Sequence, residues 1–434
     1  MNIPTDDPSA SATPRLPLGR VFAVGLGNAL EFYDFLTFSF FAVQIGHCFF
    51  PTAHGLLYSL ATFGVGFLTR PLGGIVIGRF ADRRGRKPAM TLSFVLMGVA
   101  ITGLALTPSY SQIGMAAPAL LVLFRLTQGF ALGGEVGPST AYLIEAAPPH
   151  QRGLYVALQY MTQDTAVLAA GLMGYALSTW LDPAALDAWG WRAAFLVGAL
   201  IVPLGLVLRR SLPETLAVAT VEDSSARADS RAPRLGWPAV RGLVMLGAVA
   251  IALYVTDYVA TYAEDSLKLT AKESLLAIVV LGVSTVIIDP LSGLLSDRVG
   301  RKPVMLAGAA SLVVLTVPAF VWLNRSPSVA TLCCATALLG ALASVTASPV
   351  LTTVTESLPP AVRAGTVGTI YAIAVAVFGG STQLVVKALT EATKSSLAPA
   401  WYLTGAMAIG AVAMAASPES APVRRRDRAS TEGS

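Results

Sequence analysis

The stretch GRFADRRGRKP at residues 78–88 is repeated as GLLSDRVGRKP at residues 293–303, and this repeat decides the fold. A second pair, EAAPPHQR at 145–152 and ESLPPAVR at 356–363, follows the same division of the chain. The first pair is 215 residues apart and the second 211, so the two halves of the sequence correspond along their length. We therefore predict a duplicated unit.

The composition places both copies of this unit in a membrane. Of 434 residues, 54% are hydrophobic and 13% are charged, and the mean hydropathy is +0.65, whereas soluble domains carry roughly 25% charged residues. The apolar residues form about twelve blocks of roughly 20 residues, the length of a bilayer-spanning helix, and lipid requires each block to satisfy its own backbone. This pattern argues against a soluble multidomain enzyme, a disordered chain or a solenoid. We predict an all-α membrane protein with twelve transmembrane helices in two pseudo-symmetric six-helix bundles.

The expected organisation is a polar tail at 1–20, a first bundle at 21–209, a linker at 210–238, a second bundle at 239–416 and a polar, disordered tail at 417–434. The twelve helices are expected at 21–45, 56–80, 89–107, 115–145, 154–179, 192–209, 240–263, 274–296, 303–323, 329–356, 365–390 and 399–416.

The charges set the orientation. With both termini inside, 22 of the 30 Lys and Arg residues fall on the inner side and six on the outer side, a strong positive-inside bias. The net charge of +5 is then a topology signal, and we expect no nucleic-acid partner. Three cysteines and three scattered histidines have no metal-ligand spacing, so no metal site or disulfide framework is expected.

The repeated loops have the composition of a gate. A glycine four residues before each aspartate allows two helices to approach closely, and the aspartate and arginines can bond helix ends and the following Glu/Arg pair only while the inner face is closed. The alternative is a positive-inside anchor with no gating role. The candidate gating residues are Gly78, Asp82, Arg83, Gly85, Arg86, Glu145, Arg152, Gly293, Asp297, Arg298, Gly300, Arg301, Glu356 and Arg363.

Ionisable residues inside the apolar blocks point to chemistry, because each costs roughly 2.5–3.5 kcal/mol at mid-membrane. Asn28, Glu31 and Asp34 are spaced i, i+3, i+6 and cover an arc of about 120° on the first helix. A carboxylate inside the membrane suits proton coupling, because the low polarity of its surroundings favours the protonated form. A static ion pair, or a half-helix turned towards an inner vestibule, is the alternative.

Arg125 in the fourth helix is the expected cation, since its planar fork fits a carboxylate. It could instead pair structurally with Asp34 or Glu135. Asp289 in the eighth helix could join the inner gate or pair with Arg298. The candidate substrate-binding residues are Asn28, Tyr33, Arg70, Arg125, Gln128, Gln159, Gln163 and Gln383, and the candidate proton-coupling residues are Glu31, Asp34, Glu135 and Asp257.

These motifs resemble a known family. The two G-x-x-x-D-R-x-G-R-K loops resemble the signature of the major facilitator superfamily, and residues 27–35, 70–73, 128–135 and 142–145 resemble its metabolite:proton symporters. Residues 189–192, 208–212, 378–383 and 400–403 are most similar to citrate and tricarballylate symporters. The resemblance implies alternating access and proton-driven import of a small organic acid, with a tricarboxylate favoured.

The expected partners are protons, a small organic anion and the lipid bilayer of the bacterial inner membrane, and the protein is expected to be a monomer. No enzyme activity, cofactor or nucleotide is expected, since the chain has no phosphate-cradling G-x-x-x-x-G-K-[ST] run. A symporter of a dicarboxylate, ketoglutarate, shikimate or an osmolyte remains open. So do a metabolite exporter, an uncoupled channel and a membrane receptor.

Overall fold

The computed structural model describes residues 32–84, 86–133, 140, 143–144, 147–210, 236–358 and 363–421. At 78–79, 81–84, 86–90, 200–202, 204–210 and 363–365 it describes the backbone alone. The described chain is almost entirely helical. We call the ends that carry the two repeated loops inner and the opposite ends outer, following the predicted topology.

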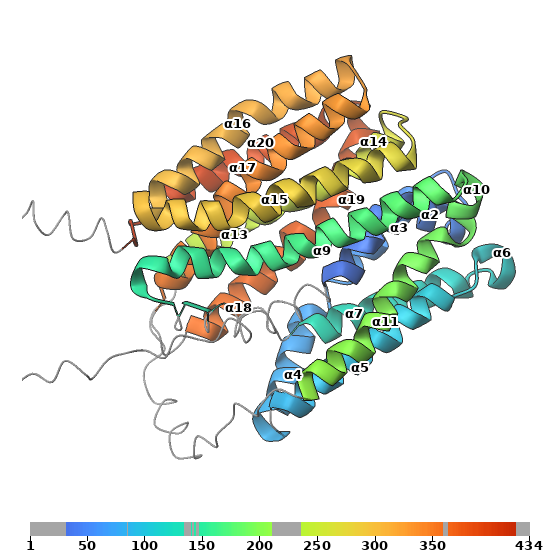
Figure 1. The fold of residues 1–434 in the computed structure, drawn as a ribbon, viewed down its shortest axis with the longest axis horizontal. Helices are drawn as coiled ribbons and strands as arrows, with labels where there is room; N and C mark the ends of the chain where they lie inside the picture. Colours follow the sequence, from blue (N-terminus) through green and yellow to red (C-terminus); the bar gives the residue numbers. More distant parts are fainter. Residues whose placement is uncertain are drawn as a thin grey trace, which may run out of the picture.

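The helices described in the first half alternate in direction (Figure 1), and each lies in or beside one of the predicted blocks. They are 32–40, α2 (Ala42–Phe49), α3 (Gly55–Val65), α4 (Arg70–Arg84), α5 (Arg86–Leu106), α6 (Tyr110–Ile113), α7 (Ala116–Leu132), η1 (Pro149–Gln151), α9 (Arg152–Trp180), α10 (Pro183–Ala185), η2 (Leu186–Gly190) and α11 (Trp191–Arg210).

The second half repeats this arrangement. Its helices are α13 (Gly236–Asp257), α14 (Val259–Asp265), α15 (Ala271–Val299), α16 (Arg301–Arg325), α17 (Val329–Glu356), α18 (Arg363–Ala374), η4 (Val375–Gly379), α19 (Gly380–Thr393) and α20 (Ala398–Ala415).

The helix expected at 56–80 is interrupted, and the cause lies in its sequence. Residues 66–69 form turns between α3 and α4, and Pro71 follows at the second position of α4. Proline has no N–H and its ring clashes with the carbonyl four residues earlier, here that of Phe67. The expectation of one continuous helix was wrong at this point, although 55–77 is still long and apolar enough to cross a membrane.

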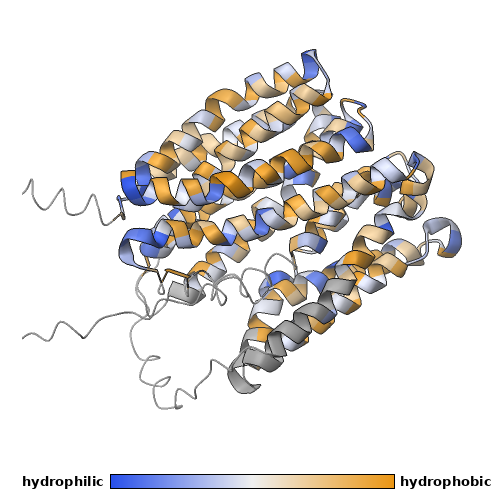
Figure 2. Ribbon diagram, in the orientation of Figure 1, coloured by the Kyte–Doolittle hydropathy of each residue, from blue (hydrophilic) through white to orange (hydrophobic). Residues whose placement is uncertain are grey.

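Seven helical spans among the described residues are long and apolar enough to cross a membrane. Large apolar side chains such as Leu68, Val314 and Val412 are more than 60% exposed on the outer surfaces of the bundles. Hydrophilic residues gather at the helix ends (Figure 2). Helical spans of this length and composition, with large apolar side chains exposed, indicate contact with lipid, so the chain is a multi-pass membrane protein.

The two halves meet most extensively along α9 and α15, which run side by side over their whole length (Figure 1). Small residues permit the approach: a Cβ added to Gly293 would lie 2.6 Å from the carbonyl oxygen of Gly153. Near the outer end, a Cβ on Gly171 would lie 2.8 Å from the side chain of Ile278. Small residues at such positions are the usual means of close helix packing in membranes.

The expectation of a disordered tail from residue 417 was wrong for 417–421. Ser417, Ser420 and Ala421 are buried against the inner end of the second bundle. Ser417 donates a hydrogen bond to the carbonyl oxygen of Ala413 at 3.0 Å, which holds the chain at the end of α20.

Candidate functional site

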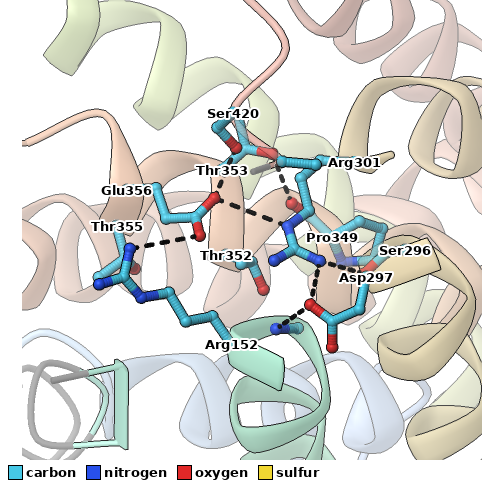
Figure 3. A network of polar contacts seen from close by, with 12 residues as sticks. Arg152, Ser296, Asp297, Arg301, Pro349, Thr352, Thr353, Thr355, Glu356 and Ser420 are labelled. Atoms are coloured by element: carbon cyan, nitrogen blue, oxygen red, sulfur yellow. Dashed lines mark hydrogen bonds and ion pairs between the residues drawn. The ribbon is translucent and has the colours of Figure 1, made fainter. Parts of the chain in front are cut away.

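At the inner end, the aspartate of the second loop caps a helix of the opposite half (Figure 3). Asp297 accepts hydrogen bonds from the backbone N–H groups of Gly153 and Leu154, each at 2.9 Å. These groups belong to the first turn of α9, where the helix dipole is positive and N–H groups lack intrahelical partners. Asp297 therefore joins the two halves through both charge and hydrogen bonding.

A buried arginine extends this contact to α17. Arg301 donates to Asp297 at 2.6 Å and to the hydroxyl of Ser296 at 3.0 Å, and its Nε lies 3.6 Å from Glu356. Arg152, from the first half, lies 4.0 Å from the same Glu356. The network thus alternates acid and base across the interface between the halves (Figure 3).

The segment after α20 completes the network. The Glu419 carboxylate accepts from the backbone N–H groups of Arg301 at 2.9 Å and Lys302 at 3.1 Å, which caps α16, and Ser420 donates to Glu356 at 2.6 Å. Gly300, between α15 and α16, has a φ of +117°, a conformation that favours glycine. Glu419 and Ser420 were not predicted from the sequence.

Of the predicted gating residues, Arg152, Gly293, Asp297, Gly300, Arg301 and Glu356 are brought together. Arg298 is exposed and lies outside the network. The other predicted gating groups, namely Gly85, Glu145 and the side-chain positions of Gly78, Asp82, Arg83, Arg86 and Arg363, lie outside what the structure describes.

Within the first half, three predicted residues form a buried polar chain. The Gln128 amide nitrogen donates to Asp34, and Arg125 donates to the Gln128 carbonyl oxygen at 2.7 Å. Asp34 is 1% exposed and Arg125 and Gln128 are 0% exposed. The other oxygen of Asp34 has no hydrogen-bond partner among the described residues, so it has the capacity to bind a proton.

Aromatic rings enclose the two membrane-embedded arginines. The Arg125 guanidinium lies 4.5 Å from the Phe35 ring centroid and 4.4 Å from that of Phe38. Arg70 lies 4.6 Å from Phe35 and 4.3 Å from Phe67. Cation–π contacts of this kind stabilise a charge away from water.

Between the halves lies a cavity of about 50 Å³. Its polar lining comes from both halves, with Tyr160, Gln163 and Asp164 on α9 and residues from α13, α15 and α18 opposite. A cavity of this volume has room for a few water molecules. The opposite polar lining consists of Tyr254, Thr256, Asp257, Thr285 and Tyr371.

The remaining predicted residues are distributed differently. Gln163 and Asp257 line the cavity. Tyr33 donates to the Ala194 carbonyl oxygen at 3.2 Å within the first half, Gln159 accepts from Thr140 at 2.7 Å, and Gln383 donates across the halves to Ser39 at 2.6 Å. Asn28, Glu31 and Glu135 lie outside the described residues. The described His, Cys, Asp and Glu residues include no group of three that could hold a metal ion.

Contacts also join the halves on the outer side of the cavity. Gln44 donates to Glu264 at 2.9 Å, and His54 lies 3.9 Å from Glu391. A Cβ on Gly64 would lie 2.7 Å from the carbonyl oxygen of Gly380, so α3 and α19 touch through their backbones. The cavity therefore has inter-half contacts at both of its ends.

Two membrane-embedded helix bundles that meet around a polar cavity, with contacts between them on each side, define a membrane transporter. The chain belongs to the Major Facilitator Superfamily, whose family model matches residues 24–382. The predicted all-α, twelve-helix fold of this superfamily is confirmed.

Relatives of known activity cover almost the whole chain. A citrate-proton symporter of Salmonella typhi is 35% identical over 92% of this chain and 93% of its own length. A citrate-proton symporter of Klebsiella pneumoniae is 35% identical over 91% of this chain and 90% of its own length. An alpha-ketoglutarate permease of Escherichia coli is also 35% identical, over 93% and 94%.

Solved structures share the fold at low identity. A crystal structure of a D-xylose-proton symporter superposes with a TM-score of 0.75 at 19% identity, covering 93% of this chain and 98% of that one. A partially occluded inward open structure of the xylose transporter XylE from E. coli gives 0.74 at 18% identity, covering 92% and 97%.

Proposed function

We propose that this protein imports a small organic acid, with a tricarboxylate such as citrate favoured, by proton symport with alternating access. The observation that carries the proposal is the buried chain Asp34–Gln128–Arg125, in which a carboxylate and an arginine share one amide. Two citrate-proton symporters align with more than 90% of this chain, and this similarity supports the same substrate class.

Asp34 is the proposed proton-coupling residue. When it carries a proton it loses its charge, and Gln128 and Arg125 are then no longer held by an anion. The other proposed proton-coupling candidates are Glu31, Glu135 and Asp257. A buried charge is costly unless it is paired. Once Asp34 is protonated, the positive charge of Arg125 is therefore balanced best by an anion other than Asp34.

The proposed substrate site is the cavity between the halves. Gln163 offers a neutral donor there. The Arg70 guanidinium lies close enough to Tyr254 and Tyr371, which line the cavity, to act on them electrostatically. Arg125 acts on Tyr254 as well, but its guanidinium also donates to the Gln128 that binds Asp34. We therefore assign anion attraction to Arg70 and compensation of Asp34 to Arg125.

The two sets of inter-half contacts are the proposed gates. The Asp297 network closes the inner side and the contacts of α3 with α19 close the outer side, and transport requires each to open in turn. We further propose a monomer in the bacterial inner membrane, with both termini cytoplasmic and the bundles 21–209 and 239–416 moving about the cavity. No enzymatic activity is proposed.

The test is uptake of labelled di- and tricarboxylates by proteoliposomes, with and without an inward proton gradient. We expect at least one tricarboxylate to accumulate and a protonophore to abolish the accumulation. Equilibration without accumulation would indicate a facilitator, and outward pumping would indicate an exporter. Either result would contradict the proposal.

A dicarboxylate such as ketoglutarate is the second candidate substrate, because the ketoglutarate permease matches this chain at the same 35% identity as the citrate symporters. Competition of unlabelled ketoglutarate against labelled citrate separates the two. Inhibition by ketoglutarate at lower concentration than by citrate would favour the second candidate.

A further inference from the structure

A second acidic site lies between the two halves, separate from Asp34. Asp164 on α9 lines the cavity, and its carboxyl group lies next to that of Asp289 on α15. Both positions are about 15–18 Å from the inner ends of their helices at 1.5 Å per residue. The pair therefore sits at mid-membrane in the seam where the halves pack most closely.

Asp289 is 1% exposed, and neither of its oxygens has a hydrogen-bond partner among the described residues. The hydroxyl of Ser344 on α17 lies beside it and is equally buried. Buried polar atoms in native proteins are nearly always hydrogen-bonded. Ser344 can donate to one oxygen of Asp289, and Asp164 can donate to the other oxygen only when it carries a proton.

The groups that face the pair supply no positive charge. They are Tyr160 on α9, Asp257 on α13, and beyond them Tyr371 on α18. No Lys, Arg or His among the described residues forms an ion pair with Asp164, Asp257 or Asp289. The nearest charged network on these helices, that of Asp297, is about 12 Å further along α15.

We propose that Asp164 and Asp289 share one proton, and that this pair is a second proton-binding site of the transport cycle. Two adjacent carboxylates in a site of low polarity cannot both ionise without strong repulsion, and one retained proton relieves it. The proton joins an oxygen of one half to an oxygen of the other. Its loss leaves two like charges that push α9 and α15 apart.

The same site explains how an anion could enter a cavity lined by acids. A polycarboxylate next to Asp164 and Asp257 is repelled unless these groups are protonated. Substrate and the shared proton therefore favour the same state, which links substrate binding to a second proton. This inference rests on the proposed proton symport, and it adds one proton to the number carried with each substrate molecule.

The test compares Asp289→Asn and Asp164→Asn with the wild type in proteoliposomes, measuring labelled citrate and proton flux together. Asp182→Asn is the matched control, because Asp182 caps α10 at the outer surface and asparagine caps as well as aspartate. We expect each pair variant to carry one proton fewer per substrate while citrate exchange continues, and the control to keep the wild-type ratio.

An unchanged ratio in both pair variants would overturn the inference, while a wild type that moves citrate without protons would overturn the proposed symport instead. Infrared spectroscopy of the purified protein provides a readout that needs no transport. The wild type should show carbonyl bands of buried protonated carboxyl groups, and each pair variant should lose one band that Asp34→Asn keeps. Retention of all these bands in both pair variants would also refute the shared proton, and a ratio that changes only on replacing Na⁺ by K⁺ would assign the site to sodium.

Discussion

The inner gate allows a quantitative prediction for Asp297→Asn. Asparagine keeps the shape of the side chain and one acceptor oxygen, but it removes the charge that faces the first turn of α9 and Arg301. Asp297 now holds two N–H groups at 2.9 Å and Arg301 at 2.6 Å. All of these contacts except that with Arg301 cross between the halves.

A charge at a helix N-terminus contributes about 0.3–1 kcal/mol, and up to about 2 kcal/mol when partly buried. The ion pair with Arg301 lies within the second half and is lost in both states, so it does not enter the difference between them. Asp297 contacts the first turn of α9 only in the closed state, and we expect that state to lose about 1–2 kcal/mol relative to the open one. At 1.4 kcal/mol per factor of ten, this is a rise of about 5- to 30-fold in the open-to-closed ratio.

The assay is electron–electron double resonance between spin labels on cysteines at His150 and Arg298. Both side chains are exposed, on opposite halves near the gate, so labels are accommodated without disturbing the network. The three native cysteines, Cys48, Cys333 and Cys334, are first replaced by serine. We expect the population at the longer distance to increase in Asp297→Asn.

A matched control is Asp182→Asn, which makes the same change at the outer surface and should leave the distance distribution as it is. If Asp297→Asn changes the open-to-closed ratio by less than threefold, the reasoning about the helix cap is refuted. A gate held mainly by the glycine contacts of α9 and α15 would give that result.

Three further predictions follow from single contacts. Asp34→Asn should abolish proton-driven accumulation but keep citrate exchange, measured as counterflow; accumulation at the wild-type level would remove Asp34 from coupling. Gly300→Ala should destabilise the protein by about 1–3 kcal/mol, because alanine is strained at a φ of +117°; the thermal midpoint should fall, whereas Gly236→Ala, which meets open space, should not lower it. Hydrogen bonding to Asp187 raises the pKa of His47 above its usual value, so this pair is charged at low pH and loses its attraction as pH rises through that raised pKa. Asp187→Asn should lower the pKa in an NMR titration of labelled histidine, and an unchanged titration would show that the 3.1 Å contact does not persist.

The fold was predictable because lipid imposes both the length and the helical form of each apolar block. The repeat of 78–88 at 293–303 then fixed two equivalent halves. The break after α3 was less predictable, since Pro71 signals a bend but does not say whether the helix continues through it. The structure resolves this by ending α3 at Val65.

A repeated Pro-Glu pair in the sequence marks the packed tail. Pro213-Glu214 follows the sixth helix and Pro418-Glu419 follows the twelfth, so the repeat extends to this position. In the structure Glu419 caps α16. A polar composition alone predicted disorder because it does not reveal that a carboxylate has two N–H groups to bind.

The cavity was predicted only in part. Helical periodicity predicts which face of its own helix carries Asp34 and which carries Gln128. The direct contact between the two side chains depends on how these two helices pack against each other. The meeting of Asp164 with Asp289 depends on the seam between halves, and no spacing within either helix encodes it. Arg125 was expected to face substrate, but the aromatic rings that enclose it are distributed over two other helices.

The most direct test of the account is the movement of protons with substrate. Proteoliposomes containing the purified protein are suspended in weakly buffered medium with no imposed gradient, citrate is added outside, and the external pH is recorded alongside uptake of label. The account predicts that the medium becomes more alkaline as citrate enters, and that Asp34→Asn removes this change. Entry of labelled citrate with no change in external pH would contradict it.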